Sequence, residues 1–445
     1  MPIDHWMMFG TFAEQRHFVY PAVDTYRGAI INGNMAAYAP DGLAAFLLEK
    51  TASLLYIVDP LTHAFQHDPD FITDKGGEAK SSIKALAEIY GEPIQGTVGK
   101  RPILPDDFAD NTVLRGFVRR CLHFQSRRLA DLMANSDAMK YLEEDEAPVL
   151  EPYALVAPYF YMTETTYEDW LDVGVRAARH AKAEYPDAKL FASVVLSQGV
   201  ILDERIRTAI VRALAQEELS GYLLWVDNLD EQAAGGAELK GLLAVARDLR
   251  SGGTREVINL HGGYFSVLAA GVLGGQAMTG VTHGPEFGEF RSVVPVGGGI
   301  PIARYYIPAL HARVRYRDAL RFLTAKKWLD DTATFHRSVC NCAECLETLH
   351  GDTANFVEFG RGTVKDVRRS GGIVRIEYPT TATKLHCLRH YLQRKAREYQ
   401  FAATASRGLI LDDLRRGHEE FKKVVGLEGV SHLSLWEKTL TSPVA

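Results

Sequence analysis

The sequence lacks long apolar runs and has few cysteines and no excess of positive charge, and each of these features excludes a class of protein. No apolar run among its 445 residues reaches the length of a membrane span, and the first ten residues have no basic start followed by an apolar core. We therefore expect neither a membrane helix nor a signal peptide. Only five cysteines occur, which fits a reducing cytoplasm. The net charge of −6 argues against a protein that coats nucleic acid non-specifically, although a locally basic groove remains compatible with it.

Three of the five cysteines fall within six residues. Cys340, Cys342 and Cys345 form a C-x-C-x-x-C pattern, and a tetrahedral zinc ion needs three or four cysteine or histidine ligands. The spacing is too short for one ideal helix face, so it indicates a knuckle loop. The fourth ligand must come from elsewhere, and the segment 380–400 offers His386, Cys387 and His390. These residues predict a structural zinc site.

The surrounding residues resemble the zinc subdomain of the tRNA-guanine transglycosylase family, including its branch that modifies DNA. The cysteine motif is followed by T-x-x-H-x-L-x-x-Y beginning at Thr383, and the run R-V-R-Y-R-D beginning at Arg313 resembles the link before the knuckle. The resemblance implies that His386 is the fourth ligand and that the protein is a homodimer. The gap between Cys345 and His386 is longer than usual, and Gly371-Gly372 within the segment 360–378 predicts an inserted hairpin.

Buried strand-like runs alternate with amphipathic helical segments from residue 150 onward, which predicts a parallel sheet. Together with runs near residues 27–34 and 54–60, and one near 292–296, the count approaches eight. We expect an α/β fold, a (β/α)8 TIM-like barrel over residues 1–322 with a zinc-binding and helical subdomain over 323–445; a doubly wound sheet is the alternative. The later expected strands are 153–161, 189–196, 221–226, 256–260 and 276–281, and the helices expected between them are 167–184, 203–218, 237–249 and 265–273.

The resemblance implies exchange of a purine base at a ribosyl carbon through two acids. Asp59 closes a buried strand and matches the acid/base aspartate that opens the family's D-S-G-G-F-Q motif, although the next residues differ. The family's nucleophilic F-D-C run is absent, because Thr282-His283 stands there instead. Glu286 or Glu289, with His283, would then form an altered nucleophilic region.

Other polar residues also follow predicted strands. Asp227, a further catalytic candidate, and His261 do so, and glycines after His261 would let a ligand approach the backbone. The expected substrate-binding residues are His261, Gly262, Gly263, Gln198 and Arg304. Arg304 follows the glycine-rich run 297–299, which either cradles a phosphate or forms a plain turn.

Two basic runs flank the cysteine motif and predict contact with a phosphate backbone, or else a solvated helix face. They comprise Arg313, Arg315, Arg317, Arg321, Lys326 and Lys327 before it and Arg389, Arg394, Lys395 and Arg397 after it.

The leading interpretation is an enzyme that replaces guanine by a 7-deazaguanine-type base in tRNA or DNA, with a structural Zn²⁺ and a purine or 7-deazapurine base as small-molecule partner. One alternative is a catalytically silent homologue that binds nucleic acid or an active partner subunit, favoured by the missing F-D-C acid. Another is a barrel hydrolase with a second metal held by Asp59, Asp227, His261 and His283.

Overall fold

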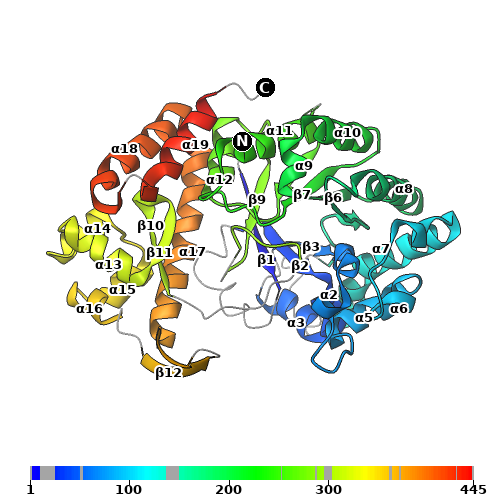
Figure 1. The fold of residues 1–445 in the computed structure, drawn as a ribbon, viewed down its shortest axis with the longest axis horizontal. Helices are drawn as coiled ribbons and strands as arrows, with labels where there is room; N and C mark the ends of the chain where they lie inside the picture. The colour runs from blue at the N-terminus through cyan, green and yellow to red at the C-terminus, as the bar shows by residue number, and fades with distance from the viewer. Residues whose placement is uncertain are drawn as a thin grey trace. The chain divides into compact units, whose positions relative to one another are not determined.

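The computed structural model describes residues 3–10, 26–50, 54–136, 150–251, 253–285, 288–294, 303–359, 363–369, 372–426 and 428–442. The chain divides into two compact units, with the main break between Val296 and Gly297. Figure 1 shows the elements of both. None of the described helices combines the length and apolar character that crossing a bilayer requires.

The first unit is a closed barrel of parallel strands. The pairing order is β3-β2-β1-β9-β8-β7-β6-β4, with the short β5 extending beside β6. The ring closes where Ile57 in β3 bridges Ala154 just before β4, and the Tyr153 amide donates to the Tyr56 carbonyl at 2.7 Å. Closure excludes a doubly wound sheet and confirms the predicted (β/α)8 architecture. The strands are β1 Asp4–Phe9, β2 Gly28–Asn32, β3 Leu55–Asp59, β4 Leu155–Ala157, β5 Tyr161–Met162, β6 Leu190–Leu196, β7 Gly221–Val226, β8 Glu256–Asn259 and β9 Gly280–His283.

Side chains from these strands fill the barrel and also face the surrounding helices. Because side chains alternate along a strand, every second residue points inward, and both faces are buried, which explains the near-continuous apolar runs. The inward cluster includes Trp6, Met8, Ile30, Ile57, Val156, Phe191, Val195, Leu223, Trp225 and Ile258.

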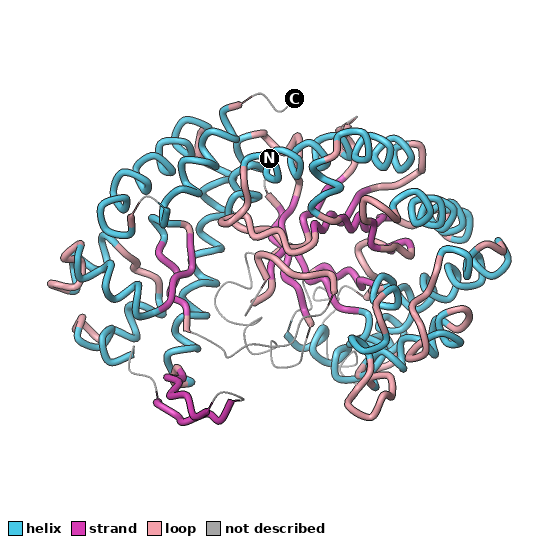
Figure 2. Tube along the Cα trace, in the orientation of Figure 1, coloured by secondary structure: helices cyan, strands magenta, loops and turns pink. Residues whose placement is uncertain are grey.

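Helices follow most of the strands and form the outer layer, as the cyan tube in Figure 2 shows. The predicted helix at 167–184 is confirmed without change, and the other expected barrel helices lie within a few residues of their predicted bounds. The longer helices of this unit are α2 Gly33–Tyr38, α3 Pro40–Lys50, α5 Ser81–Tyr90, α7 Asn111–Ala134, α8 Tyr167–Glu184, α10 Glu204–Ala215, α11 Gly236–Leu249 and α12 Tyr264–Val272. The shorter ones are η3 Thr62–Gln66, α4 Pro69–Ile72, α6 Ile94–Thr97, η4 Pro105–Phe108 and α9 Gln198–Leu202.

One strand of the ring differs from the sequence prediction. The eighth strand is β1, at residues 4–9, and not the run near 292–296, of which the described residues 292–294 form no strand. β1 lies between β2 and β9, pairing Trp6 with Gly28 and with Thr282. The apolar run Trp6-Met7-Met8-Phe9 was the available signal, but a short apolar run near the start of a chain does not by itself distinguish a strand.

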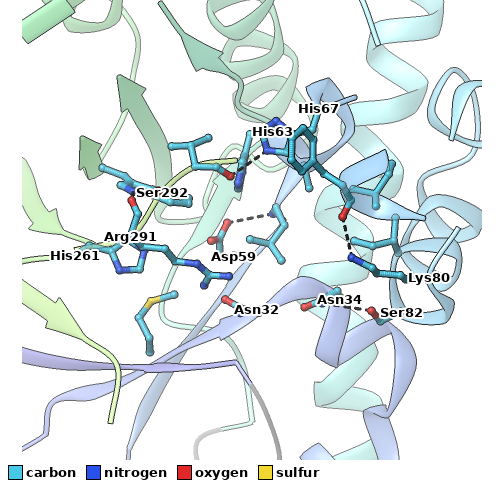
Figure 3. Close-up of a pocket in the computed structure, with 18 residues that line it drawn as sticks. Asn32, Asn34, Asp59, His63, His67, Lys80, Ser82, His261, Arg291 and Ser292 are labelled. Atoms are coloured by element: carbon cyan, nitrogen blue, oxygen red, sulfur yellow. Dashed lines mark hydrogen bonds between the residues drawn. The ribbon is translucent and has the colours of Figure 1, made fainter. Parts of the chain in front are cut away.

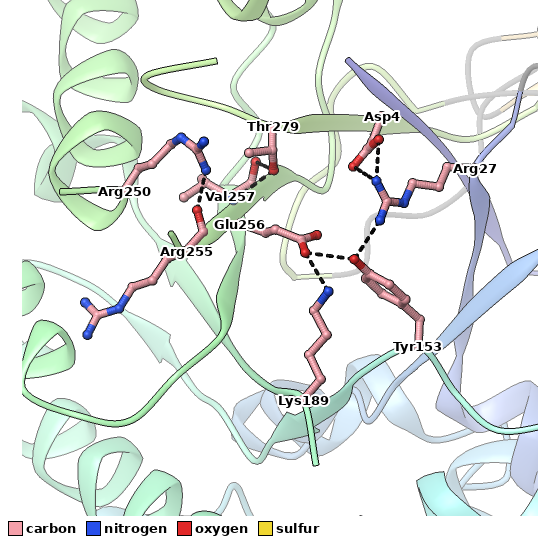
Figure 4. A network of polar contacts seen from close by, with 9 residues as sticks. All are labelled: Asp4, Arg27, Tyr153, Lys189, Arg250, Arg255, Glu256, Val257 and Thr279. Carbon is pink, nitrogen blue, oxygen red and sulfur yellow. Dashed lines mark hydrogen bonds and ion pairs between the residues drawn. The ribbon is translucent and has the colours of Figure 1, made fainter. Parts of the chain in front are cut away.

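The two ends of the barrel have different chemistry. The carboxyl ends of the strands surround a pocket (Figure 3), whereas the amino ends carry a polar network (Figure 4). In this network the Glu256 carboxylate accepts from Tyr153 and Lys189 at 2.8 and 2.5 Å, and Arg27 donates to Tyr153 and to Asp4, both at 2.7 Å. The amino ends of five strands are thereby tied together, which is the role expected of polar groups at this face.

The second unit contains two small sheets and seven α-helices among its described residues. Its elements are β10 Arg304–Ile307, η7 Pro308–Leu310, β11 Ala312–Arg315, α13 Tyr316–Ala325, α14 Thr332–Ser338, α15 Ala343–Leu349, α16 Ala354–Phe359, β12 Thr363–Arg369, β13 Gly372–Tyr378, α17 Thr381–Thr404, α18 Arg407–Val425, η8 Glu428–Val430 and α19 Ser431–Thr441. The inserted hairpin predicted around Gly371-Gly372 is confirmed as β12 and β13.

The break between the units precedes the boundary expected at residue 322. The β10–β11 hairpin and α13 belong to the second unit, because Tyr305 of β10 stacks on His390 of α17, with ring centroids 4.2 Å apart. α17 also contributes to a buried polar cluster. His311 contacts Glu398 at 3.3 Å and Asp413 at 3.0 Å, and Lys395 pairs with Glu398 at 3.2 Å.

Candidate functional site

Asp59 is the last residue of β3, and its position follows from the local sequence. Pro60 ends the strand, and the chain then turns through Leu61, whose φ of 52° lies in the left-handed region. The Leu61 amide donates to Asp59 Oδ1 at 3.1 Å, which holds the carboxyl in place. A left-handed leucine is strained, and such strain is often found at functional sites.

A pocket of about 190 Å³ opens beside this carboxyl (Figure 3). Its walls come from the ends of β1, β2 and β3, the start of α2, the helical segments between β3 and β4, the end of β7, His261 just beyond β8, and the segment 291–293. Among the described residues that line the pocket, Asp59 is the one acidic residue. The lining side chains used below are Asn32, Asn34, Asp59, His63, Trp225, His261 and Arg291.

The Asp59 carboxyl is fully buried, and burial raises its pKa to about 6. The Tyr159 hydroxyl donates to Asp59 Oδ1 at 2.6 Å, and this bond together with the nearby Arg291 charge limits the rise in pKa. His63 Nδ1 lies 3.0 Å from the same hydroxyl, so a chain of hydrogen bonds runs from His63 through Tyr159 to Asp59. Burial lowers the pKa of His63, which keeps the imidazole neutral and lets Nδ1–H donate to Tyr159.

Arg291 lies at the mouth of the pocket and was not singled out from the sequence. Figure 3 shows its guanidinium directed toward Asp59 and Asn32. Its backbone is fixed because the Arg291 carbonyl accepts from the Asn228 amide at 2.9 Å and from Trp225 Nε1 at 3.1 Å. The segment that carries Arg291 is irregular, so no periodic pattern in the sequence marks it.

His261 lines the same pocket. Its ring packs 4.8 Å from that of Trp225, and burial lowers its pKa to about 3, so it is neutral. Its Nδ1 atom is buried without a hydrogen-bond partner, as are the side-chain oxygens of Asn32 and Asn34. Three orphaned polar atoms in one pocket favour a polar ligand there, since buried polar groups are nearly always paired.

His283 is placed elsewhere. It shares the outward side of the barrel wall with Met7, is fully buried, and its Nε2 lies 2.9 Å from Nε2 of His5. The neighbouring Thr282 takes the inward position opposite Trp6, and its hydroxyl is buried without a partner. Because side chains alternate along β9, only one of the two can face the barrel interior, and that residue is Thr282.

Asp227 and Gln198 organise the mouth of the barrel and do not line the pocket. Asp227 accepts from the Val293 amide at 2.7 Å and from the Tyr161 hydroxyl at 3.0 Å. Gln198 donates to the backbone carbonyls of Asp227 and Asn228 at 3.0 and 3.1 Å. Both residues therefore hold the segment that carries Arg291.

The glycines after His261 serve packing. A Cβ on Gly262 would lie 2.3 Å from a Val281 methyl, and one on Gly263 would lie 2.7 Å from Glu231. Glu231 is a second buried carboxyl near this face, with a pKa raised to about 7 by burial, and Ser266 at the start of α12 donates to it. The close approach that requires glycine here is therefore to β9 and Glu231.

The predicted nucleophilic region is only partly described. Glu286 lies outside the described residues. Glu289 does not line the pocket. Asp59, Asp227, His261 and His283 do not converge as metal ligands, and the described residues form one metal-binding group, in the other unit.

That group consists of Cys340, Cys342, Cys345 and His390, all buried, with donor atoms within 4.8 Å of one another. His390 Nδ1 lies 3.3 Å from the Cys345 sulfur and 3.6 Å from that of Cys342. Donor atoms around a tetrahedral zinc lie about 3.5–3.8 Å apart, given bonds of about 2.0–2.3 Å. His390 Nε2 lies 2.7 Å from the Tyr306 carbonyl, to which it donates, leaving Nδ1 as a ligand atom. The cluster can therefore hold a metal ion.

The fourth member of the cluster corrects the sequence prediction, which favoured His386. Both histidines lie on α17, one turn apart, and so share a face of the helix. His390 is the one that reaches the thiols, whereas His386 Nδ1 lies 2.9 Å from the Thr348 hydroxyl and 3.5 Å from Glu344. The sequence offered both residues, and spacing alone could not choose between successive turns.

Several charges of the expected basic surface have partners within the second unit. Arg389 lies 3.8 Å from Glu344, Arg397 donates to Asn341 at 2.6 Å, and Lys326 lies 3.2 Å from Glu420. Arg304 begins β10 in this unit and is not part of the barrel pocket. The glycine-rich run 297–299 lies outside the described residues.

No family model and no curated protein matches the sequence. Among solved structures, the chain is similar to an intracellular xylanase from Thermoanaerobacterium saccharolyticum JW/SL-YS485, with a TM-score of 0.33, 10% identity and coverage of 66% of this chain and 86% of that one. It is also similar to the carboxyl transferase domain of pyruvate carboxylase from Rhizobium etli, with a TM-score of 0.33, 10% identity and coverage of 96% and 54%. These similarities are too weak to inform function, and the barrel assignment rests on the strand pairing above.

Proposed function

We propose that this protein is a transglycosylase-like enzyme that replaces guanine by a 7-deazaguanine-type base in tRNA or DNA, with Asp59 transferring protons. The observation that carries the proposal is the Asp59 carboxyl, buried at the carboxyl end of β3 in a polar pocket with a pKa raised to about 6. A pKa near the working pH suits a group that must act as both acid and base. The resemblance at the cysteine motif supplies the reaction class.

Base exchange needs two proton movements at one place. The departing base gains a proton on a ring nitrogen as its glycosidic bond breaks, and the incoming base loses one as the new bond forms. Asp59 can give the first proton and take the second, because about equal fractions of it are protonated and ionised near pH 6. The Tyr159 bond to Oδ1 fixes the carboxyl and leaves its other oxygen for the base.

The pocket also has groups suited to a planar base. Trp225 and His261 provide aromatic surface, and the unpartnered oxygens of Asn32 and Asn34 would accept from the exocyclic amine of a guanine-type base. The target nucleotide would have to leave its stack to enter the barrel mouth, as in other enzymes that act on bases.

A second candidate is the catalytically silent homologue that binds nucleic acid or an active partner subunit. It is favoured by Thr282, which faces the barrel interior at the position where the family carries its nucleophilic acid. Glu286 and Glu289 stay candidates for a relocated nucleophile.

We further propose that the ion held by Cys340, Cys342, Cys345 and His390 is a structural zinc. Three thiolates and one imidazole in a closed, buried set are typical of structural zinc sites, whereas a catalytic zinc keeps a position open. Homodimerisation and a cytoplasmic location stay predictions.

The function is tested by base exchange. The purified protein, with its zinc content verified, is incubated separately with tRNA and duplex DNA and with labelled guanine or 7-deazaguanine. We expect label in one polymer, lost in Asp59→Asn and kept in Asp169→Asn, a matched change at an exposed position of α8. Loss in Glu286→Gln or Glu289→Gln would locate the nucleophile. Absence of label in both polymers with the wild-type protein would favour the silent homologue.

A further inference from the structure

The inserted hairpin of the second unit forms a two-stranded sheet of its own. β12 and β13 pair antiparallel over seven positions, from Thr363 opposite Tyr378 to Arg369 opposite Gly372. Figures 1 and 2 show it projecting beyond the beginning of α17. We call residues 363–378 the ribbon.

Both faces of the ribbon are exposed where side chains are described. Directly opposed residues share a face, so Ile373 lies with Arg368 on one side and Val374 with Val367 on the other. Val364 is 60% exposed, Ile373 72% and Val374 44%. An isolated two-stranded ribbon is marginally stable in water, so exposed β-branched residues on both faces favour a partner that covers both.

The charge of the ribbon indicates what that partner is. The ribbon contains four basic and two acidic residues, so its net charge is +2, whereas the whole chain has a net charge of −6. One acidic residue, Asp366, pairs across the strands with Arg375 at 3.2 Å. Charge complementarity therefore points to a polyanion. The basic residues are Lys365, Arg368, Arg369 and Arg375.

We propose that the ribbon inserts into the major groove of B-form duplex DNA. Two strands about 4.8 Å apart, with side chains on both faces, suit a groove about 12 Å wide that admits a two-stranded ribbon. Seven residues per strand extend about 23 Å, which matches about seven base pairs. The major groove of A-form RNA is deep and narrow and does not admit such an element.

Lys365 and Arg368 would contact phosphates, and the exposed valine and isoleucine side chains would contact thymine methyl groups. The inference rests on the proposed function and deepens it, because it selects duplex DNA as the polymer.

Binding is measured by fluorescence anisotropy with a labelled 30-base-pair DNA duplex and an RNA duplex of the same sequence, over a series of salt concentrations. The test variant is Lys365→Ala with Arg368→Ala. The matched control is Arg212→Ala with Lys240→Ala, two exposed cations on barrel helices. A second variant replaces the whole ribbon by a two-glycine link. Two glycines can join the flanking residues because Thr363 and Tyr378, at the two ends of the ribbon, are directly paired. Zinc content and circular dichroism check that each variant folds.

We expect the double variant to lower the salt slope for DNA by about 2 and the affinity roughly sixtyfold at 0.1 M salt, at about 0.9 in slope per phosphate contact. The control should bind DNA like wild type, and the ribbon deletion should weaken DNA binding at least as much. Unchanged DNA binding in both ribbon variants would overturn the inference, as would an equal loss of affinity for the RNA duplex. A changed oligomeric state with unchanged DNA binding would overturn it in favour of a second copy of the chain as partner.

The DNA-binding test of the ribbon and the base-exchange test of the proposed function can fail independently. Base exchange that persists in both ribbon variants, with DNA binding unchanged, would overturn the inference and leave the function standing. Ribbon-dependent DNA binding without base exchange in any polymer would uphold the ribbon's role and reject the enzymatic function.

Discussion

Replacing Asp59 by asparagine should stabilise the barrel at neutral pH while removing its proposed activity. Asparagine keeps an oxygen that can accept from Tyr159 and from the Leu61 amide, so the hydrogen bonds at Oδ1 survive. What the change removes is the cost of a buried charge. Burial raises the pKa of Asp59 from 3.8 to about 6, which corresponds to about 3 kcal/mol of destabilisation once the carboxyl is ionised.

The size of the effect depends on pH in a defined way. Below pH 3.8 the carboxyl is protonated in both the folded and unfolded chain, so ionisation adds no difference between variant and wild type. Between pH 3.8 and about 6 the unfolded chain loses its proton first, and the stability of the wild type falls relative to Asp59→Asn. Above about pH 6 the difference levels off.

Urea unfolding at pH 4, 5, 6, 7 and 8 measures this difference, with hydrogen exchange of β3 and β7 amides reporting on the barrel. Peptides from α17 and α18 provide an internal control, because the second unit should not respond. The reasoning that Asp59 is a buried, ionised group would be refuted if Asp59→Asn were less stable than wild type at pH 8. It would also be refuted if the difference in unfolding free energy between the two proteins were the same at every pH.

The remaining predictions concern both units. His390→Ala should lose bound zinc and unfold the second unit, whereas His386→Ala should retain zinc, as metal analysis and circular dichroism would show; the reverse result would restore His386 as ligand. Tyr159→Phe removes a bond that lowers the pKa of Asp59, so the acidic limb of a pH–rate profile should move upward; an unmoved limb would contradict the pairing. The pKa of His311 is raised by its two carboxylate partners although burial opposes this, so its stabilisation is present below pH 6.5 and lost as the pH rises through its folded value. The stability advantage of wild type over His311→Asn should therefore shrink above pH 6.5 in urea unfolding of the zinc-loaded protein, and a growing advantage would exclude this account.

The barrel was predictable because its signals are local and repeated. Continuous apolar runs such as 221–226 predict strands buried on both faces, and the charged, amphipathic run 167–184 predicts its helix without adjustment. The hairpin at Gly371-Gly372 was predictable for the same reason. β1 was missed because its short run stands apart from the regular alternation.

The site was less predictable because it depends on which way side chains point. Asp59 and His261 both follow strands, which is a signal the sequence carries, and both line the pocket. His283 was expected beside them, but the alternation of β9 turns it outward and turns Thr282 inward. Arg291 has no sequence signal, because its position is set by hydrogen bonds from Asn228 and Trp225 to its carbonyl. The choice between two histidines one helical turn apart likewise required the fold.

Direct binding of the free base to the barrel tests the central claim most sharply. Isothermal titration of 7-deazaguanine into the zinc-loaded protein should show one site per chain, weakened at least tenfold in Asp59→Ala and unchanged in Asp169→Asn, since 1.4 kcal/mol from one lost charged hydrogen bond is tenfold in affinity. Failure to bind, or equal binding by the wild type and Asp59→Ala, would contradict the claim that the pocket beside Asp59 receives the base.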